Sequence, residues 1–120
     1  MTGKPHPTAA LDEVVHQRHR LGILTIVAEA DRVEFGYLRE TLDLTPGNLS
    51  RHVTVLEQAG LIEIEKGYAG RRPRTWVHVT RAGRHALTAE LAALAQLVAD
   101  HRAAGDNGSS APARPATDPS

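Results

Sequence analysis

The stretch TPGNLSRHVTVLEQAG, residues 45–60, decides how the rest of the chain is interpreted. The hydroxyl of Thr45 can accept a hydrogen bond from a free amide at the start of a helix. Pro46 suits the first helical position, because the amide N–H that proline lacks would have no partner there. Three apolar residues then repeat at helical spacing, namely Leu49, Val53 and Leu56. Ala59-Gly60 offers a helical stop. We therefore predict an amphipathic helix over residues 46–59.

The residues before this stretch predict more helices. Phe35, Leu38 and Leu42 define a short helix that ends close to Asp43, so a tight turn at Asp43-Leu44 joins two helices. Residues 11–30 show helical spacing of Leu11, Val14, Val15, Leu21, Leu24, Val27 and Ala28. Residues 16–20 contain no apolar residue, so the pattern predicts either one helix or two shorter helices that meet at an angle. A break in the helical pattern follows at residues 31–34.

The residues after the stretch predict a hairpin and a last helix. Leu61–Lys66 and Thr75–Thr80 alternate apolar with polar residues and are typical of half-buried strands, joined by the basic loop GYAGRRPR. Thr80 can cap a helix with a narrow apolar stripe of Leu87, Leu91, Leu94 and Val98. The predicted class is therefore mainly α with a small β-hairpin, an α+β fold in the order helix, helix, helix, hairpin, helix.

Residues 44–87 resemble the winged helix-turn-helix DNA-binding regulators of the MarR and ArsR type, in particular a small branch with a GRRPR wing and a threonine-capped terminal helix. The resemblance extends from Leu11 to Leu97. It implies that the third helix enters the major groove, that the hairpin touches the minor groove or backbone, and that the terminal helices build a twofold dimer. Relatives of this type often carry a proline at the bend in the first helix, where this chain has Arg18.

The polar face of the third helix supplies the candidate base contacts. If its leucines and valine face the core, helical geometry turns Asn48 and Arg51 outward, and these side chains suit bidentate contacts with adenine and guanine. Ser50 can reach a phosphate or a base, and Gly47 lets the helix start approach the DNA closely. The candidate set is Thr45, Pro46, Gly47, Asn48, Ser50, Arg51, His52 and Thr54. The alternative is that these residues form an ordinary solvated helix face.

The hairpin supplies the candidate backbone contacts. From Lys66 to Arg84 the chain contains no Asp or Glu, so this stretch is locally basic. Phosphate contact or minor-groove insertion would use such arginines. The candidate wing residues are Lys66, Tyr68, Arg71, Arg72 and Arg74. The alternatives are that Tyr68 packs within the loop and that the charges only prevent aggregation at a strand edge.

The predicted dimer joins the stripe on the last helix to the apolar face of the first. Its candidate residues are Leu11, Val14, Val15, Leu87, Leu91, Leu94 and Val98. The alternative is that the stripe covers the core of its own domain. A further hypothesis is that an unidentified small-molecule effector binds between the first and last helices. It would change the distance between the two recognition helices of the dimer, which are the third helix of each subunit.

Composition narrows the function classes. Lys plus Arg equals Asp plus Glu at 14 each, so total charge does not favour nucleic acid, and 3% aromatic content leaves no platform for stacking single-stranded bases. Cysteine is absent, and no signal peptide or membrane span is visible, so we expect a cytoplasmic protein. Seven histidines include His16 and His19 on one helix face, but no ligand cluster is recognisable, so we expect no metal, no cofactor and no enzymatic activity.

These observations lead to a domain division and two functional hypotheses. Residues 1–10 are predicted to be a flexible N-terminal tail, residues 11–104 the DNA-binding and dimerisation domain, and residues 105–120 a disordered C-terminal tail. The leading hypothesis is a homodimeric repressor that binds a two-fold symmetric site on double-stranded DNA. The second is a winged-helix module that binds another protein instead.

Overall fold

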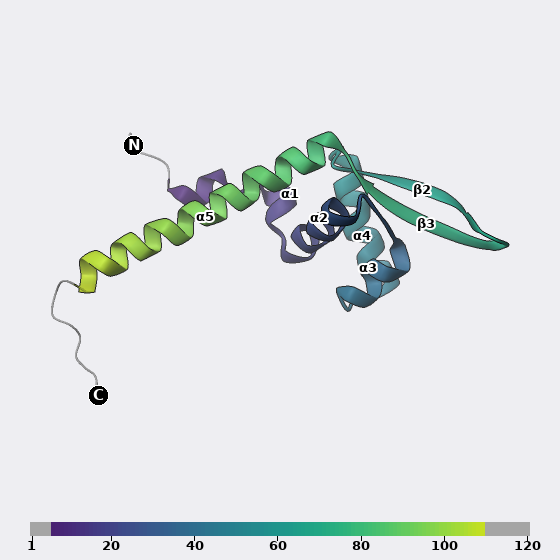
Figure 1. Ribbon diagram of the computed structural model, residues 1–120, viewed down its shortest axis with the longest axis horizontal. Coiled ribbons are helices and arrows are strands. Elements are labelled where there is room, and N and C mark those ends of the chain that lie inside the picture. Colours follow the sequence, from purple (N-terminus) through teal and green to yellow (C-terminus); the bar gives the residue numbers. More distant parts are fainter. Residues whose placement is uncertain (1–5, 110–120) are drawn as a thin grey trace, which may run out of the picture.

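The computed structural model describes residues 6–109 of the 120-residue chain (Figure 1). Its elements in chain order are the 3-10 helix η1 (Pro7–Ala10), α1 (Glu13–His16), α2 (Arg18–Ala30), β1 (Arg32–Glu34), α3 (Phe35–Thr41), α4 (Pro46–Gln58), β2 (Ile62–Ala69), β3 (Arg72–Val79) and α5 (Arg81–Ser109). The predicted α+β class and the order helix, helix, helix, hairpin, helix are confirmed. The strand β1 is an addition.

The predicted first helix is two helices, α1 and α2. Gln17 separates them with an extended backbone, at φ −61° and ψ 129°. Its side-chain oxygen accepts hydrogen bonds from the amides of His19 at 2.8 Å and Arg20 at 3.0 Å. Arg18 is the first residue of α2, a position where proline is also tolerated, so the bend persists without the proline of the resembling regulators.

The sheet contains a strand that the sequence pattern did not reveal. Residues 32–34, expected to lie in a break, form β1 and pair antiparallel with β3, so the strand order is β1-β3-β2. Three residues are too few to show an alternating pattern, and their conformation depends on a partner far along the chain. The register pairs Arg32 with His78, Val33 with Val77 and Glu34 with Trp76.

The hairpin is longer than predicted, and most of the expected loop over residues 67–74 is strand. β2 and β3 pair from Ile62↔Val79 to Ala69↔Arg72, which leaves a two-residue turn. Gly70 in that turn has φ +67°, a conformation that glycine adopts without a steric penalty. The prediction failed here because the backbone ladder continues past the point where apolar residues stop alternating.

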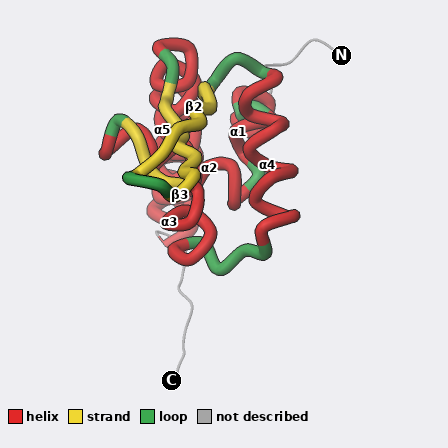
Figure 2. The backbone as a smooth tube through the Cα atoms, turned by 90° about the vertical axis from the view of Figure 1, so that its right-hand side faces the viewer, coloured by secondary structure: helices red, strands yellow, loops and turns green. Residues whose placement is uncertain are grey.

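The core lies between α2, α3, α4 and the inner face of the sheet. Its fully buried side chains come from all these elements, and include Ile23, Leu24, Val27, Leu38, Leu49, Leu56, Ile62 and Val77. The helix α4 ends as expected, because the amide of Leu61 bonds to Leu56 O at 3.0 Å and that of Gly60 to Glu57 O at 2.9 Å. Figure 2, seen from the hairpin end, shows α4 running beside the strands.

Thr80 joins the hairpin to α5, as predicted. Its hydroxyl accepts the amide of Gly83 at 2.9 Å and donates to Gly60 O at 2.7 Å. Gly83 packs directly on the start of the hairpin, because a Cβ built there would lie 2.0 Å from Leu61 O. The last helix therefore begins at a fixed position relative to α4 and the sheet.

The helix α5 spans 29 residues and extends well beyond the body of the molecule, with η1 beside it (Figure 1). Its last residues, 105–109, and the helix η1 fall within the two predicted tails. The other tail residues, 1–5 and 110–120, lie outside the described part of the chain. Over residues 6–109, no helix combines the length and the apolar character needed to cross a membrane.

Candidate nucleic-acid interface

The helix α4 presents one buried and one exposed face. Leu49, Val53 and Leu56 are buried, whereas most of the candidate contact residues are exposed, namely Thr45, Pro46, Gly47, Asn48, Ser50, Arg51 and Thr54. The hydroxyl of Thr45 accepts the amide of Asn48 at 3.1 Å, so the predicted cap is present. His52 is the exception, because it is half-buried at the edge of the face.

The exposed face has two sides with different neighbours. Ser50 and Thr54 line a groove of about 590 Å³ between α4 and the hairpin, and Lys66 and Thr75 line its opposite wall. Arg51 lies close to the point of α4 furthest from the core, since it is two residues from the buried Leu49 and helical residues turn about 100° each. Asn48 and His52 lie beyond it, on the side away from the groove.

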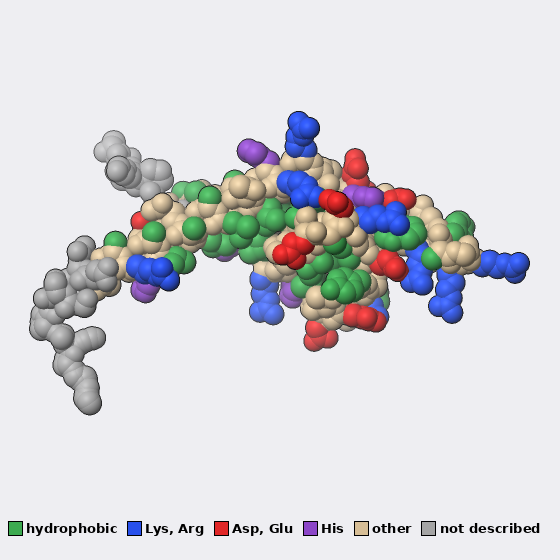
Figure 3. All heavy atoms as spheres, viewed as in Figure 1, with side chains coloured by type: hydrophobic (Ala, Val, Ile, Leu, Met, Phe, Trp, Pro, Cys, Tyr) green, Lys and Arg blue, Asp and Glu red, His purple; other side chains and the backbone are tan. Residues whose placement is uncertain are grey.

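The hairpin exposes four of the five candidate wing residues. Lys66, Arg71 and Arg72 are exposed, and Tyr68 is 71% exposed, so over the described residues it is not packed within a loop. None of these three cations takes part in an ion pair of the described residues. Figure 3 shows Lys and Arg side chains projecting from the far end of the hairpin. This surface can meet a polyanion without first breaking internal ion pairs.

Arg74 differs from the other wing arginines. It is half-buried, and its guanidinium contacts the Glu34 carboxylate at 2.7 Å. Arg84 likewise pairs with Asp31 at 2.5 Å. The stretch from Lys66 to Arg84 is thus acid-free in sequence but partly neutralised in space, because β1 and the residue before it bring two carboxylates to it. Sequence reasoning missed Glu34 and Asp31 because it missed β1.

The outer face of the sheet holds a second set of paired charges. Glu65 contacts His78 at 2.5 Å and Arg32 at 3.5 Å, and the Arg32 guanidinium lies 4.5 Å from the centre of the Trp76 ring. The hydrogen bond from His78 and, next, the charge of Arg32 lower the pKa of Glu65. This face is internally neutralised, so it is a poorer surface for DNA than α4 and the hairpin end.

A basic cluster lies at the contact between α2 and α4. The rings of His19 and His52 are 5.3 Å apart, and Arg20 Nη1 lies 3.4 Å from His52 Nδ1. Burial and then the charges of Arg20, His19 and Arg51 lower the pKa of His52. Sequence reasoning placed His52 on the contact face but did not connect it with His19 or Arg20.

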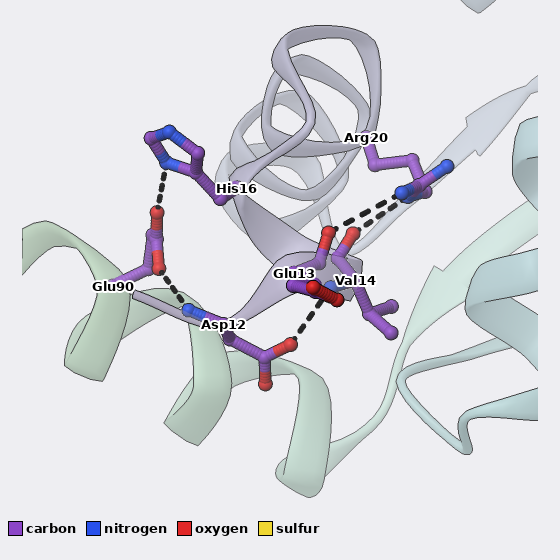
Figure 4. A network of polar contacts seen from close by, with 6 residues as sticks. All are labelled: Asp12, Glu13, Val14, His16, Arg20 and Glu90. Atoms are coloured by element: carbon purple, nitrogen blue, oxygen red, sulfur yellow. Dashed lines mark hydrogen bonds and ion pairs between the residues drawn. The ribbon is translucent and has the colours of Figure 1, made fainter. Parts of the chain in front are cut away.

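A polar network ties α1 to α5 (Figure 4). The carboxylate of Glu90 is buried, and its two oxygens contact His16 Nδ1 at 2.7 Å and accept the amide of Asp12 at 3.1 Å. His16 is therefore separated from His19, with which it was expected to share a helix face. Over the described residues, no three histidine or acidic side chains are grouped as metal ligands.

The candidate dimer residues divide into buried and accessible ones. Val15 and Leu87 belong to the core of this subunit, so they are not available to a partner in this structure. Leu11, Val14 and Leu94 are half-buried. Leu91 and Val98 on α5 are 48% and 50% exposed. The accessible apolar surface thus lies on the projecting part of α5.

Comparison with known proteins places this geometry among DNA-binding domains. Residues 19–98 match the family described as "Winged helix DNA-binding domain". A transcriptional regulator homologue from Pyrococcus horikoshii OT3 is 34% identical, with a TM-score of 0.70, over 74% of this chain and 88% of that one. An uncharacterized protein of Methanocaldococcus jannaschii is 38% identical over 65 residues, which are 54% of this chain and 71% of that protein.

A more distant solved structure shares the fold. The MarR-family transcriptional regulator from Rhodococcus sp. RHA1 has a TM-score of 0.61 at 21% identity, over 79% of this chain and 66% of that one. At that identity the likeness concerns the arrangement of helices and strands.

Proposed function

The chain belongs to the winged helix DNA-binding domain family, and on that premise we propose that it is a homodimeric transcriptional repressor of the MarR/ArsR-like type. Each subunit reads one half of a two-fold symmetric operator with α4 and contacts the flanking backbone with its GRRPR wing. Residues 11–104 form the DNA-binding and dimerisation domain in this proposal.

One observation carries the proposal. The helix α4 and the hairpin lie on either side of one groove, which Lys66 lines from the hairpin and Glu57 from α4. Lys66, Arg51 on the exposed face of α4, and Arg71 and Arg72 at the end of the hairpin take part in no ion pair within residues 6–109. Elsewhere on the sheet the arginines are paired. Unpaired cations that flank a polar helix face suit a polyanion, and Asn48 and Arg51 add groups that distinguish base pairs.

The two parts of the surface have different roles in this proposal. Arg51 and Asn48 contact base edges, whereas Lys66, Tyr68, Arg71 and Arg72 contact the backbone or the minor groove. Arg74 supports the wing by holding β1 against it through Glu34. Base contacts carry sequence preference, and backbone contacts carry most of the salt dependence.

A titration of labelled duplex DNA tests the DNA-binding proposal. We expect the affinity to fall steeply with salt, with a log-log slope of about −0.9 for each phosphate contact. On the preferred sequence, selected from random duplexes, Arg51→Ala should cost about 1 to 3 kcal/mol and relax the preference. Arg72→Ala should weaken all duplexes similarly and reduce the salt slope by about 1. Arg102→Ala, on the projecting part of α5, is the matched control.

Two results would contradict these roles. If Arg51→Ala and Arg72→Ala change affinity and salt slope alike, the division into base reader and backbone contact is wrong. Absence of binding to any duplex at low salt would favour the protein-binding alternative, in which the hairpin or α5 is the contact surface.

The dimer is proposed from the exposed apolar side chains of α5. Leu91 and Val98 are separated by two helical turns and so lie on one side of α5, with Leu94 between them. Leu91→Glu should yield monomers in sedimentation, whereas Ala89→Glu, the same change on the other side of α5, should leave the dimer intact. A persistent Leu91→Glu dimer would place the interface elsewhere. An effector bound between α1 and α5 would act by changing the spacing of the two α4 helices.

A further inference from the structure

Four basic side chains gather beside the recognition helix, on the side of α4 away from the hairpin. His19 and Arg20 come from the first turn of α2, and Arg51 and His52 from α4. No ion pair of residues 6–109 involves any of the four. Clustered cations without an anion repel one another, and after burial the charges of these neighbours contribute to the lowered pKa of His52. The cluster therefore favours binding of an external anion.

The central cation of the cluster is held in position. Arg20 donates from Nε to Val14 O at 2.6 Å and from Nη2 to Glu13 O at 3.3 Å, as Figure 4 shows. Its Nη1 faces His52 Nδ1 at 3.4 Å. A guanidinium has five N–H groups in a fixed plane, and the two contacts with backbone carbonyls fix its orientation. The contact with His52 requires an unprotonated Nδ1, so on protonation of His52 both N–H groups of Nη1 and one of Nη2 are left for a ligand.

We propose that Arg20, His19 and His52 form a binding site for a backbone phosphate of the DNA duplex, and that protonation of His52 strengthens this contact. The inference rests on the proposed function, because the phosphate belongs to the duplex that α4 reads. A phosphodiester fits the cluster, since its oxygens accept hydrogen bonds from both a guanidinium and an imidazolium. The site is next to Asn48 and Arg51, so one duplex can reach all of them.

The direction of the pH effect follows from the charges around His52. In the free protein the groups that face it are Arg20 and His19 from α2 and Arg51 from α4, all basic. Burial, and then these charges, lower the pKa of His52 below 6.5. The helix α1 contributes the backbone carbonyls of Glu13 and Val14, which accept hydrogen bonds from Arg20. A bound phosphate would offset these charges and raise the pKa of His52, so binding would take up protons.

The linkage has a defined sign. A group whose pKa rises on binding adds affinity that is fully present below its pKa in the free protein, and that is lost as pH rises through its pKa in the complex. Each unit by which the pKa rises corresponds to a tenfold gain in affinity on the acid side, so we expect binding about tenfold tighter near pH 5.5 than near pH 8. Other histidines, such as His16 and His78, contact carboxylates away from this cluster.

Fluorescence anisotropy with a labelled random-sequence duplex of about 30 base pairs tests the proposal, because phosphate contacts do not depend on sequence. The titration is done between about pH 5.5 and 8.5 at constant ionic strength. We expect the wild type to show the pH dependence and the double variant His19→Gln/His52→Gln to lose it. The matched control is His85→Gln/His101→Gln, which changes two exposed histidines of α5 and should keep it.

A second measurement does not require the variants to fold. The pKa of His52, followed by NMR in the wild type, should rise when the duplex is added. An unchanged pKa, or a double variant that folds and keeps the pH dependence, would overturn the phosphate site. Salt-dependent binding without any pH dependence would overturn this inference and leave the proposed function standing, whereas no duplex binding at any salt concentration would overturn both.

Discussion

The substitution Gly83→Ala provides a sharp test of how α5 joins the rest of the domain. A Cβ at this position would lie 2.0 Å from Leu61 O and 2.8 Å from Val79 Cγ2. Both distances are below 3.0 Å, the limit that real Cβ atoms keep. The first atom belongs to the backbone at the start of the hairpin, so it cannot rotate away as a side chain end can. Either α5 or the hairpin would have to move by about 1 Å, a shift that close-packed interiors resist.

Two opposing effects set the size of the change. In an open helix, alanine is more favourable than glycine by about 1 kcal/mol. Forcing an extra methyl group into a filled space costs typically about 1 to 3 kcal/mol, and more where backbone must move. The shift would also weaken the hydrogen bond that Leu61 O accepts from the amide of Thr80 at 3.1 Å, which contributes about 1 kcal/mol. We therefore expect Gly83→Ala to lower the free energy of unfolding by about 2 kcal/mol or more.

Urea denaturation at one fixed protein concentration measures this change, because the stability of the proposed dimer would depend on concentration. The matched control is Gly105→Ala in the same helix, where an added Cβ meets no atom within 4 Å. That variant should be as stable as the wild type or more stable, by up to about 1 kcal/mol. If Gly83→Ala were also neutral or stabilising, the close approach of α5 to Leu61 would be refuted.

Three further predictions concern single side chains. A Cβ added at Gly47 meets no atom within 4 Å, so Gly47→Ala should raise thermal stability slightly. The same variant should weaken duplex binding if the start of α4 approaches DNA closely, and an unchanged affinity would contradict that close approach. Thr80→Val should lower the free energy of unfolding by about 1 to 2 kcal/mol in urea, because the amide of Gly83 loses its acceptor; a change near zero would show that the cap is unimportant. Since the folded state lowers the pKa of Glu65 below 4.5, its stabilising contribution is present above that pH and is lost on acidification through the lower value. Glu65→Gln should therefore lower the melting temperature at neutral pH, and the difference from wild type should vanish in acid; a constant difference would exclude the linkage.

The helices that the sequence predicted are those whose signals lie within one or two turns. The cap of α4 by Thr45, its buried face and its end at Gly60 all depend on residues close along the chain. The same is true of Thr80 at the start of α5. Helical spacing and capping are local properties of the chain, so the sequence displays them directly.

The candidate site was predictable only in part. The exposure of Asn48 and Arg51 followed from helical periodicity, because their neighbours Leu49 and Val53 are buried. The different state of Arg74 did not follow, since its partner Glu34 lies 40 residues away on a strand too short to recognise. Likewise, the narrow stripe on α5 did not reveal that Leu87 belongs to the core while Leu91 is exposed, because this depends on where α5 leaves the body of the molecule.

By itself, then, the sequence determined the order of the helices, their caps and the polar face of α4, because each depends on spacing within a few residues. The tertiary structure decided which charges are free to meet a ligand. It paired Arg74 and Arg84 with carboxylates from the residues around β1, gave Arg71 and Arg72 no ion-pair partner within residues 6–109, and brought Arg20 to His52. Charge pairing depends on distances in space between residues far apart in the chain, and only the packing of the elements sets those distances.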